Sequence, residues 1–204
     1  MDQGSFLQVI AFVKVIYQAF PIGKDDTHVA LITVAGSAKI WFGFNSYLSV
    51  KRLDAAVARV RNSRGPLRLA SGFNVARTRL FAVSARKGIP NVLIVFASNN
   101  PGRAFVTASA NARVSGILVF AIGTRGNVKQ NWLNAMASTP QFSLRVPSVA
   151  KLMLNIQGVA DKLGQGKFYI WVILTKIVIS LWENCDILKM ISLWAKLFFF
   201  NSIF

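Results

Sequence analysis

The chain has 204 residues, of which 24 are basic and 7 are acidic, so its formal net charge is +17. This length allows one domain of ordinary size with a short appendage, and the hydrophobic fraction of 53% suffices for a sizeable core. The positive charge favours polyanions and anionic surfaces as partners without specifying one. Cys185 is the only cysteine, which excludes a disulfide within the chain.

Helical and strand patterns alternate from the start of the chain. Apolar residues at helical spacing predict an amphipathic helix over residues 5–19. Strands are predicted over 28–35 and 39–44, with a short hairpin between them. A helix over 50–62 follows. Its predicted apolar face consists of Leu53, Ala56, Val57 and Val60.

The second half continues this alternation. Ser71 is the predicted N-cap of a helix over 71–85. Two nearly continuous apolar runs, 91–97 and 116–123, are typical of strands buried on both faces. The remaining elements are helices over 104–114, 127–138 and 147–163 and a short strand over 141–146. This order predicts an α/β fold with a doubly wound, mostly parallel sheet and helices on both faces.

In such sheets ligands bind beyond the carboxyl ends of the strands, where 98–102 and 123–126 lie. Neither segment resembles a catalytic or phosphate site, since 123–126 lacks the lysine and the spacing of a phosphate loop. His28 is the only histidine, which excludes a multi-histidine metal cluster. Cys185 is far in sequence from any candidate base, and no carboxylate pair is placed for acid–base chemistry. We therefore expect no enzymatic activity.

Several segments resemble, in order and spacing, the landmarks of a von Willebrand factor type A domain. Residues 6–47 are similar to the first helix, the hairpin strands and the "FxLNSY"-like segment of that family. The later segments "VLIVFASNN", "GILVFAIGTRG" and "FSLRVPSVAKL" match three further landmarks. The resemblance covers residues 5–163 and is closest to the modules of collagen VI-type alpha chains.

The metal site that this resemblance implies lacks its ligands. Family members that hold a metal supply Asp-x-Ser-x-Ser after a first strand, a Thr before the third helix and the Asp of a Thr-Asp-Gly. Leu69 or Ala70 stands at the Thr position, and Ala97-Ser98-Asn99 stands at the Thr-Asp-Gly position. Magnesium prefers oxygen ligands that include a carboxylate. We expect Leu69 and Ser98 to mark a degenerate site, with no metal and no other cofactor.

The resemblance also implies that the module is truncated at its N-terminus, with the central first strand missing. The chain begins with "MDQGS" immediately before the first predicted helix. The strands that flank the missing one, predicted over 28–35 and 91–97, would then lack their shared partner, which predicts marginal stability. Two arrangements could replace the missing strand. The flanking strands could pair directly, or the β-branched run over 170–179 could take its place.

Basic residues form a cluster in the sequence after the second predicted strand. The cluster consists of Lys51, Arg52, Arg59, Arg61, Arg64 and Arg68, and it is extended by Arg77, Arg79, Arg86 and Lys87. One interpretation is a polyanion patch for glycosaminoglycan or acidic protein, and the other is a set of solvated helix faces. Nucleic acid is disfavoured, because Phe73 and Phe81 are expected in the core and not interleaved with the charges.

Composition changes near Gly164, which divides the chain into a truncated type A-like domain, 1–167, and a hydrophobic tail, 168–204. The tail contains two apolar runs of 15 residues, each with one lysine. Spanning a bilayer takes about 20 apolar residues. The tail is therefore interpreted either as a membrane anchor or hairpin, or as a product of an alternative or read-through frame without selected structure.

Together these features predict a non-enzymatic protein–protein interaction module of extracellular-matrix type that needs no metal. One alternative is a pseudogene-like product without a stable fold. Another is a basic membrane-surface protein anchored by 168–204. The resemblance implies the extracellular matrix, but no signal peptide is recognisable, since Lys14 interrupts the first apolar stretch, and this leaves intracellular retention open. The sequence does not name a partner or an oligomeric state.

Overall fold

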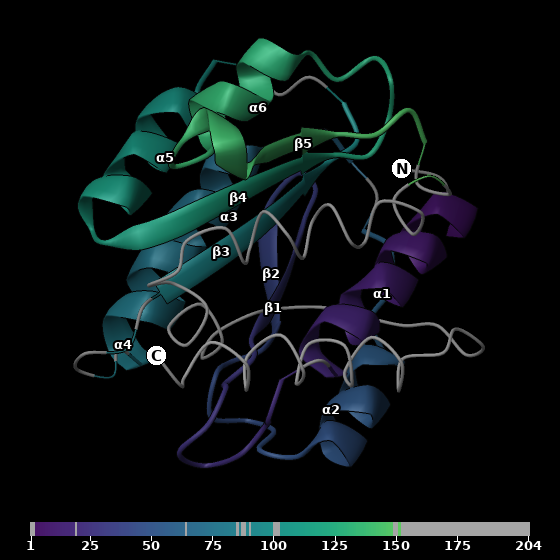
Figure 1. The fold of residues 1–204 in the computed structure, drawn as a ribbon, viewed down its shortest axis with the longest axis vertical. Coiled ribbons are helices and arrows are strands. Elements are labelled where there is room, and N and C mark those ends of the chain that lie inside the picture. The colour runs from purple at the N-terminus through teal and green to yellow at the C-terminus, as the bar shows by residue number, and fades with distance from the viewer. Residues whose placement is uncertain are drawn as a thin grey trace, which may run out of the picture.

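The computed structural model describes residues 3–18, 20–63, 65–84, 86, 89, 91–99, 103–148 and 151. The helices in this part of the chain are α1 (Gln3–Gln18), α2 (Val50–Val57), α3 (Leu69–Val75), α4 (Ala82–Ser84), α5 (Phe105–Val114) and α6 (Gln130–Met136), as Figure 1 shows. The strands are β1 (Leu31–Val34), β2 (Ala38–Phe42), β3 (Asn91–Ala97), β4 (Ile117–Gly123) and β5 (Ser143–Arg145). A π-helical segment, η1 (Ala76–Phe81), joins α3 to α4, and a 3-10 turn, η2 (Pro140–Phe142), precedes β5.

The described strands form two separate hydrogen-bonded sheets. β1 and β2 make an antiparallel hairpin, in which Val34 is opposite Ala38 and the register shifts between Leu31 and Ile32. β3, β4 and β5 make a parallel sheet with β4 at its centre. The fold is thus the expected α/β arrangement of parallel strands and helices. The predicted possibility that the strands at 28–35 and 91–97 pair directly is wrong, because β1 and β3 belong to different sheets.

Helices cover both faces of the strands (Figure 1). On one face, α1 and α2 pack against a core that includes Phe120 and Ile122 of β4. On the other face, α3, α5 and α6 pack against a second core that includes Val119 and Ala121 of the same strand. Successive side chains of a strand point to opposite faces, so β4 contributes alternately to both cores. Full burial of one such Val, Ile or Phe side chain contributes about 1.5–3 kcal/mol.

α1 forms because its apolar residues recur at helical spacing. The buried residues of this helix are Phe6, Val9, Phe12, Val13, Ile16 and Tyr17. The Tyr17 hydroxyl donates a hydrogen bond to the Asp54 carboxylate of α2, and this joins the two helices across their interface. The predicted helix over 5–19 is therefore confirmed, with its start two residues earlier.

The start of α3 differs from the prediction. Ser71 does not cap this helix, which begins at Leu69 with Arg68 in the N-cap position. The Arg68 backbone N–H donates to the Ala35 carbonyl oxygen (3.2 Å), and the Ser71 hydroxyl accepts the Ala38 backbone N–H (3.0 Å). The helix therefore starts where the hairpin provides partners for its first turn, and Ser71 serves the hairpin instead of the helix end.

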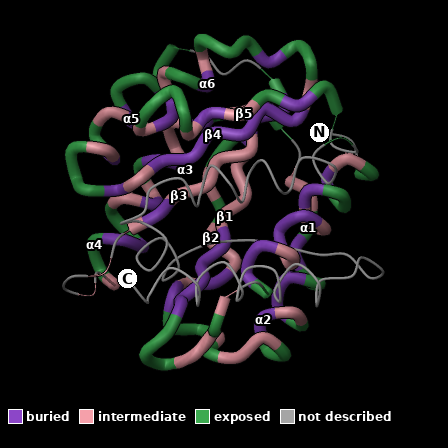
Figure 2. Tube along the Cα trace, in the orientation of Figure 1, coloured by how far each residue is buried: buried purple, intermediate pink, exposed green. Residues whose placement is uncertain are grey.

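β3 is less buried than its apolar sequence predicts. Leu93, Ile94, Val95 and Phe96 are all half-buried, whereas in β4 only Leu118 is (Figure 2). Among the described residues β3 pairs with β4 alone, so its other edge has no neighbouring strand. Burial on both faces is therefore confirmed for β4 and wrong for β3.

Other boundaries agree with the predictions to within a few residues. α2 ends at Val57 and α6 spans Gln130–Met136, so both helices are shorter than their apolar patterns suggest. The predicted closing helix over 147–163 and the tail over 168–204 lie outside the described residues. Within the described part of the chain, no helix is both long enough and apolar enough to cross a membrane.

Candidate functional site

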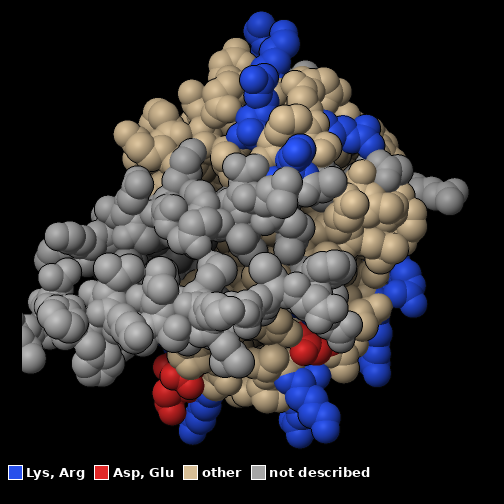
Figure 3. Space-filling model, turned by 45° about the vertical axis from the view of Figure 1, so that its right-hand side comes forward, with Lys and Arg blue, Asp and Glu red and all other residues tan. Residues whose placement is uncertain are grey.

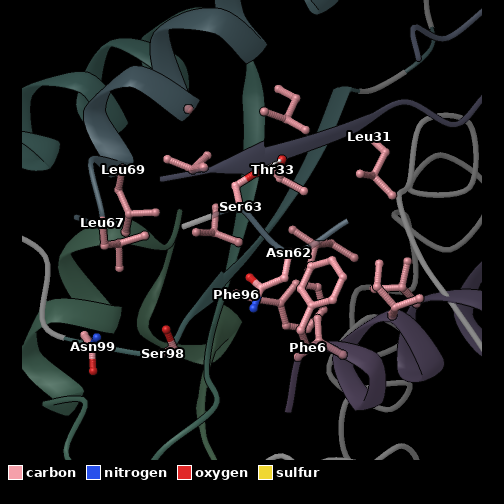
Figure 4. Close-up of a pocket in the computed structure, with 18 of the residues that line it drawn as sticks. Phe6, Leu31, Thr33, Asn62, Ser63, Leu67, Leu69, Phe96, Ser98 and Asn99 are labelled. Carbon is pink, nitrogen blue, oxygen red and sulfur yellow. Dashed lines mark hydrogen bonds between the residues drawn. The ribbon is translucent and has the colours of Figure 1, made fainter. Parts of the chain in front are cut away.

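A cleft with a volume of about 290 Å³ lies between β1 and β3. All four residues of β1 line one side, and Leu93, Ile94, Val95 and Phe96 of β3 line the other. α1 closes one face with Phe6 and neighbouring side chains, and α3 closes the opposite face with Leu69 and Phe73 (Figure 4). No Asp, Glu, Lys, Arg or His is among the described residues that line it. The cleft is therefore apolar and uncharged.

Two of the polar side chains in the walls of the cleft, Thr33 and Ser63, are bonded to each other. The Thr33 and Ser63 hydroxyl oxygens lie 2.9 Å apart, and the Trp41 indole N–H donates to the Thr33 hydroxyl (2.9 Å). These bonds hold the loop after α2 against the hairpin. They leave the apolar side chains as the main surface that a ligand would meet.

The predicted degenerate metal positions lie on one side of the cleft. Ser98 and Asn99 follow β3 and Leu69 begins α3, and Figure 4 shows them on the same side of the cleft, with Leu69 beside Leu67 and apart from Ser98 and Asn99. The two positions that the resemblance pairs, Leu69 and Ser98, therefore both line this cleft.

This side of the cleft does not have the donors that a magnesium ion requires. Leu69 is buried in the core beneath α3, and Ser98 is buried with a neutral hydroxyl. Asn99 is exposed and offers only an amide. Among the described residues no three or more His, Cys, Asp or Glu side chains are grouped so that they could hold a metal. A magnesium site uses carboxylate oxygens, so these residues do not fit the metal that the family resemblance implies.

The second predicted strand end, at 123–126, is a structural turn. Thr124 is fully buried, and both its backbone N–H and its hydroxyl donate to the Ala97 carbonyl oxygen, at 2.9 and 3.2 Å. The Gly126 backbone N–H donates to the Pro147 carbonyl oxygen (3.0 Å). This turn therefore ties the end of β4 to the end of β3 and to the segment after β5.

His28 is a buried structural residue outside the cleft lining. It is 6% exposed, and its Nε2 atom lies 2.9 Å from the Lys24 carbonyl oxygen. It precedes β1, since the strand begins three residues later than predicted. The contact holds the exposed turn that carries Asp25 and Asp26 against the start of the hairpin.

The contact between Tyr17 and Asp54 was not predicted from the sequence. Tyr17 is fully buried, and its hydroxyl bonds the carboxylate that also lies 3.4 Å from the Gln18 amide nitrogen. Burial, followed by the hydrogen bond to Asp54, raises the pKa of Tyr17 well above its ordinary value. The phenol therefore stays protonated and acts as a structural link. The sequence signal was an aspartate within an otherwise apolar helix face.

The basic cluster is exposed but spread out. The exposed members are Lys51, Arg52, Arg59, Arg61 and Arg68, and Arg64 lies outside the described residues. Lys51 and Arg52 are on the first turn of α2, whereas Arg68 directly precedes α3 on the opposite face of the strands. Figure 3 shows Lys and Arg at both the upper and the lower end of the face drawn, with the few acidic side chains near the lower end.

The extension of this cluster is only partly on the surface. Arg79 is exposed, Arg77 and Arg86 are half-buried, and Lys87 lies outside the described residues. The Arg86 guanidinium donates to the Asp26 carbonyl oxygen at 2.5 Å. Arg86 is thus engaged in holding the turn before β1.

Comparison with known sequences gives a family match over most of the chain. A sequence model of the von Willebrand factor type A domain matches residues 1–158. Matrilin-3 of Mus musculus is 32% identical over 141 residues, which are 66% of this chain and 29% of the relative. Matrilin-1 of Homo sapiens is 30% identical over 141 residues, which are 67% of this chain and 28% of the relative. The chain therefore spans less than a third of the length of these relatives.

Solved structures give the same match. Proximal thread matrix protein 1 from the mussel byssus superposes with a TM-score of 0.72 at 25% identity, over 78% of this chain and 40% of that protein. In that structure the MIDAS motif is occupied by zinc. A von Willebrand factor type A protein from Catenulispora acidiphila superposes with a TM-score of 0.62 at 14% identity, over 79% of this chain and 39% of the other. The second likeness shows the fold alone.

Proposed function

Because the chain belongs to the von Willebrand factor type A family, we propose that it is a non-enzymatic protein-interaction module that binds its partner without a metal ion. Matrilins are among its relatives, so we place its partners among extracellular-matrix proteins. The resemblance of residues 5–163 to collagen VI-type modules supports a collagen VI-like role within that class. The extracellular matrix is accordingly its proposed location.

The observation that carries the proposal is the chemistry at the carboxyl ends of the strands. Leu69 and Ser98 stand where the resemblance implies metal ligands, both line the cleft, and neither supplies a carboxylate. A divalent cation loses hydration water when it binds, and neutral donors compensate poorly for that loss. A partner therefore has to be held by protein contacts alone.

Surface plasmon resonance of the full chain tests the proposal. The probes are immobilised collagen VI and immobilised matrilin-3, with serum albumin as the control surface. We expect saturable binding to a matrix protein that is equal in magnesium and in EDTA. Loss of binding in EDTA contradicts metal independence, and absence of saturable binding to both matrix proteins contradicts the proposed partner class.

A second proposal, supported by the exposed basic residues, is that the chain also binds glycosaminoglycan. Lys51 and Arg52 lie together on one exposed turn of α2. Each charge contact with a polyanion adds to the salt dependence of binding. On a heparin column the double variant Lys51→Ala/Arg52→Ala should elute at lower salt than the matched double variant Arg103→Ala/Arg145→Ala, whose residues are exposed elsewhere. Equal elution of the two variants argues against a patch at α2.

The membrane-surface alternative predicts a different result. It requires that 168–204 anchor the chain, and these residues lie outside the described part. Flotation of the full chain with anionic liposomes in high salt, which screens the basic surface, separates an apolar anchor from charge attraction. We expect the protein to remain at the bottom of the gradient under these conditions, and flotation would favour the anchor.

A further inference from the structure

Two strand edges face each other across the cleft, and no described strand lies between them. Among the described residues β1 pairs only with β2, and β3 pairs only with β4. The free edge of each strand lines the cleft. In Figure 4 β1 runs from Leu31 to Thr33, and β3 runs from Phe96 to Asn99, toward the same end of the cleft. An extended segment placed between them could form ladder hydrogen bonds with both edges.

The walls of the cleft specify the chemistry of that segment. Its side chains would point alternately toward Val9 and Val13 of α1 and toward Leu69 and Phe73 of α3. Because both directions end in apolar core, both sets of side chains have to be apolar. A strand with two buried faces has a continuous apolar sequence instead of an alternating one. The absence of charged lining residues in the described cleft excludes a charged occupant.

One segment of this chain has that sequence. The run "IWVILTKIVI", residues 170–179, has seven β-branched residues among ten and a single charge, Lys176. The comparable runs over 31–34, 91–97 and 117–123 already form β1, β3 and β4. β-branched residues favour strands, whereas the later apolar run over 190–204 contains few of them.

The chain is long enough to bring this run to the cleft. Eighteen residues separate Lys151, the last described residue, from Ile170. An extended chain of that length spans up to about 60 Å, while a domain of this size has a radius of gyration of only about 15 Å. A tethered segment also acts at an effective concentration in the millimolar range. The linker between Lys151 and Ile170 is therefore long enough for residues 170–179 to reach the cleft.

We propose that residues 170–175 dock in the cleft as a strand parallel to β1 and β3. In this direction Lys176 emerges beside the exposed Asn99, where its ammonium group stays in water. In the opposite direction Lys176 would lie beside the segment before β1, where Val29 and Ala30 are buried and an ammonium group would lose its hydration. The docked strand joins the two sheets into one.

Paired cysteines in the full chain test the contact and its direction. In a Cys185→Ser background, Ile94→Cys is combined in turn with cysteine at each position from 170 to 175, and Val95→Cys is combined with the same set. Strand side chains alternate, so positions that cross-link to residue 94 under mild oxidation should fail to cross-link to residue 95, and the reverse. Absence of this alternation, or cross-links found only between two chains, overturns the proposal.

A second measurement uses one reporter cysteine and does not depend on cross-link geometry. In the Cys185→Ser, Ile94→Cys chain the docked strand should shield the thiol from an alkylating reagent. Proline cannot sit between two paired strands, so adding Ile173→Pro should speed labelling by about tenfold or more. Ile191→Pro, the matched control in the second apolar run, should leave the rate unchanged. Equal rates in all three proteins overturn the proposal, and Val95→Cys replaces Ile94→Cys as reporter if the latter does not fold.

Discussion

β3 and β4 have nearly the same composition but different surroundings. Both strands have seven residues, both are almost entirely apolar, and they pair in parallel from Asn91 opposite Ile117 to Ala97 opposite Gly123. Yet Leu93 to Phe96 are half-buried while the matching part of β4 is buried. An apolar run is therefore enough to make a segment a strand, but the neighbours on each side determine how much of it is buried.

The same difference explains where the functional surface lies. β4 has a paired strand on each edge and helices on both faces, and all of its residues except Leu118 are buried. β3 packs less closely against the helices than β4 does, and it borders the cleft on one edge. The apolar side chains of β3 thus face a site, and those of β4 form the rigid support behind it.

The largest expected loss of stability comes from replacing a phenylalanine of β4, and the same change in β3 provides the comparison. Phe120 of β4 is 4% exposed, and its ring centroid lies 4.3 Å from that of Phe142. Phe120→Ala should destabilise the protein by about 3–5 kcal/mol, as expected for a buried phenylalanine. Chemical denaturation of the full chain measures this cost, and a loss below about 1 kcal/mol would show that β4 is not the centre of the core.

Phe96 of β3 is the matched residue for comparison, because it borders the cleft. Its ring centroid lies 6.0 Å from that of Phe12. If residues 170–175 cover it, the cost of Phe96→Ala should fall in the Ile173→Pro background by about 0.5–3 kcal/mol, a usual coupling energy for residues in contact. The cost of Phe120→Ala should be the same in both backgrounds. Identical costs for Phe96→Ala in both backgrounds would place the tail elsewhere.

A smaller effect is expected at the ends of the paired strands. A Cβ atom at Gly123 of β4 would lie 2.9 Å from a Leu133 methyl carbon and 3.3 Å from the Val128 Cβ, whereas β3 accommodates Ala97 at the opposing position. Gly123→Ala should therefore cost about 1–3 kcal/mol through overpacking. An alanine that proves neutral by thermal unfolding would mean that α6 is more loosely packed on β4 than the structure indicates.

The hydrogen bonds that tie β4 to β3 make a more modest contribution. Thr124→Val removes the hydroxyl that donates to the Ala97 carbonyl oxygen at 3.2 Å and keeps the volume of the side chain. We expect a loss of about 0.5–1.5 kcal/mol, while Thr124→Ser retains the donor and should restore part of it. Urea unfolding compares the three proteins. Thr124→Ser that is less stable than Thr124→Val would assign the role to packing.

The smallest effect is expected for metal binding. Ser98→Asp places one carboxylate at the end of β3, but Leu69 and the remaining positions still supply no ligand. Magnesium titration by calorimetry should show no saturable site in either the original chain or the variant. A saturable site in the original chain would contradict the metal-independent proposal, whereas a site in the variant alone would mean that one carboxylate completes the donor set.

Local pattern predicted the elements well, because each pattern has its own physical period. α1, the hairpin, β3, α5 and β4 were all placed within a few residues of their observed bounds. Leu69 and Ser98 were also singled out, and both line the cleft, but that they mark a degenerate metal site stays a prediction. These successes depend on side-chain spacing and on order along the chain, which a sequence shows directly.

Features that depend on contacts between distant segments could not be predicted in the same way. Ser71 fits the pattern of an N-cap, but the Ala38 backbone N–H, 33 residues earlier, uses its hydroxyl instead. The Tyr17 contact with Asp54 likewise joins two helices that are separate in the sequence. The half-buried state of β3 follows from the lack of a second neighbouring strand among the described residues, and its own apolar run carries no sign of that.

Amide hydrogen exchange of the full chain at low concentration most directly tests whether the cleft is occupied by a strand. If residues 170–175 dock there, the amides of β1 and β3 should exchange as slowly as those of β4, and Ile173→Pro should speed the exchange of β1 and β3 alone. Fast exchange of the β1 and β3 edges in the unmodified chain, with β4 still protected, would contradict the account and show that the cleft is open.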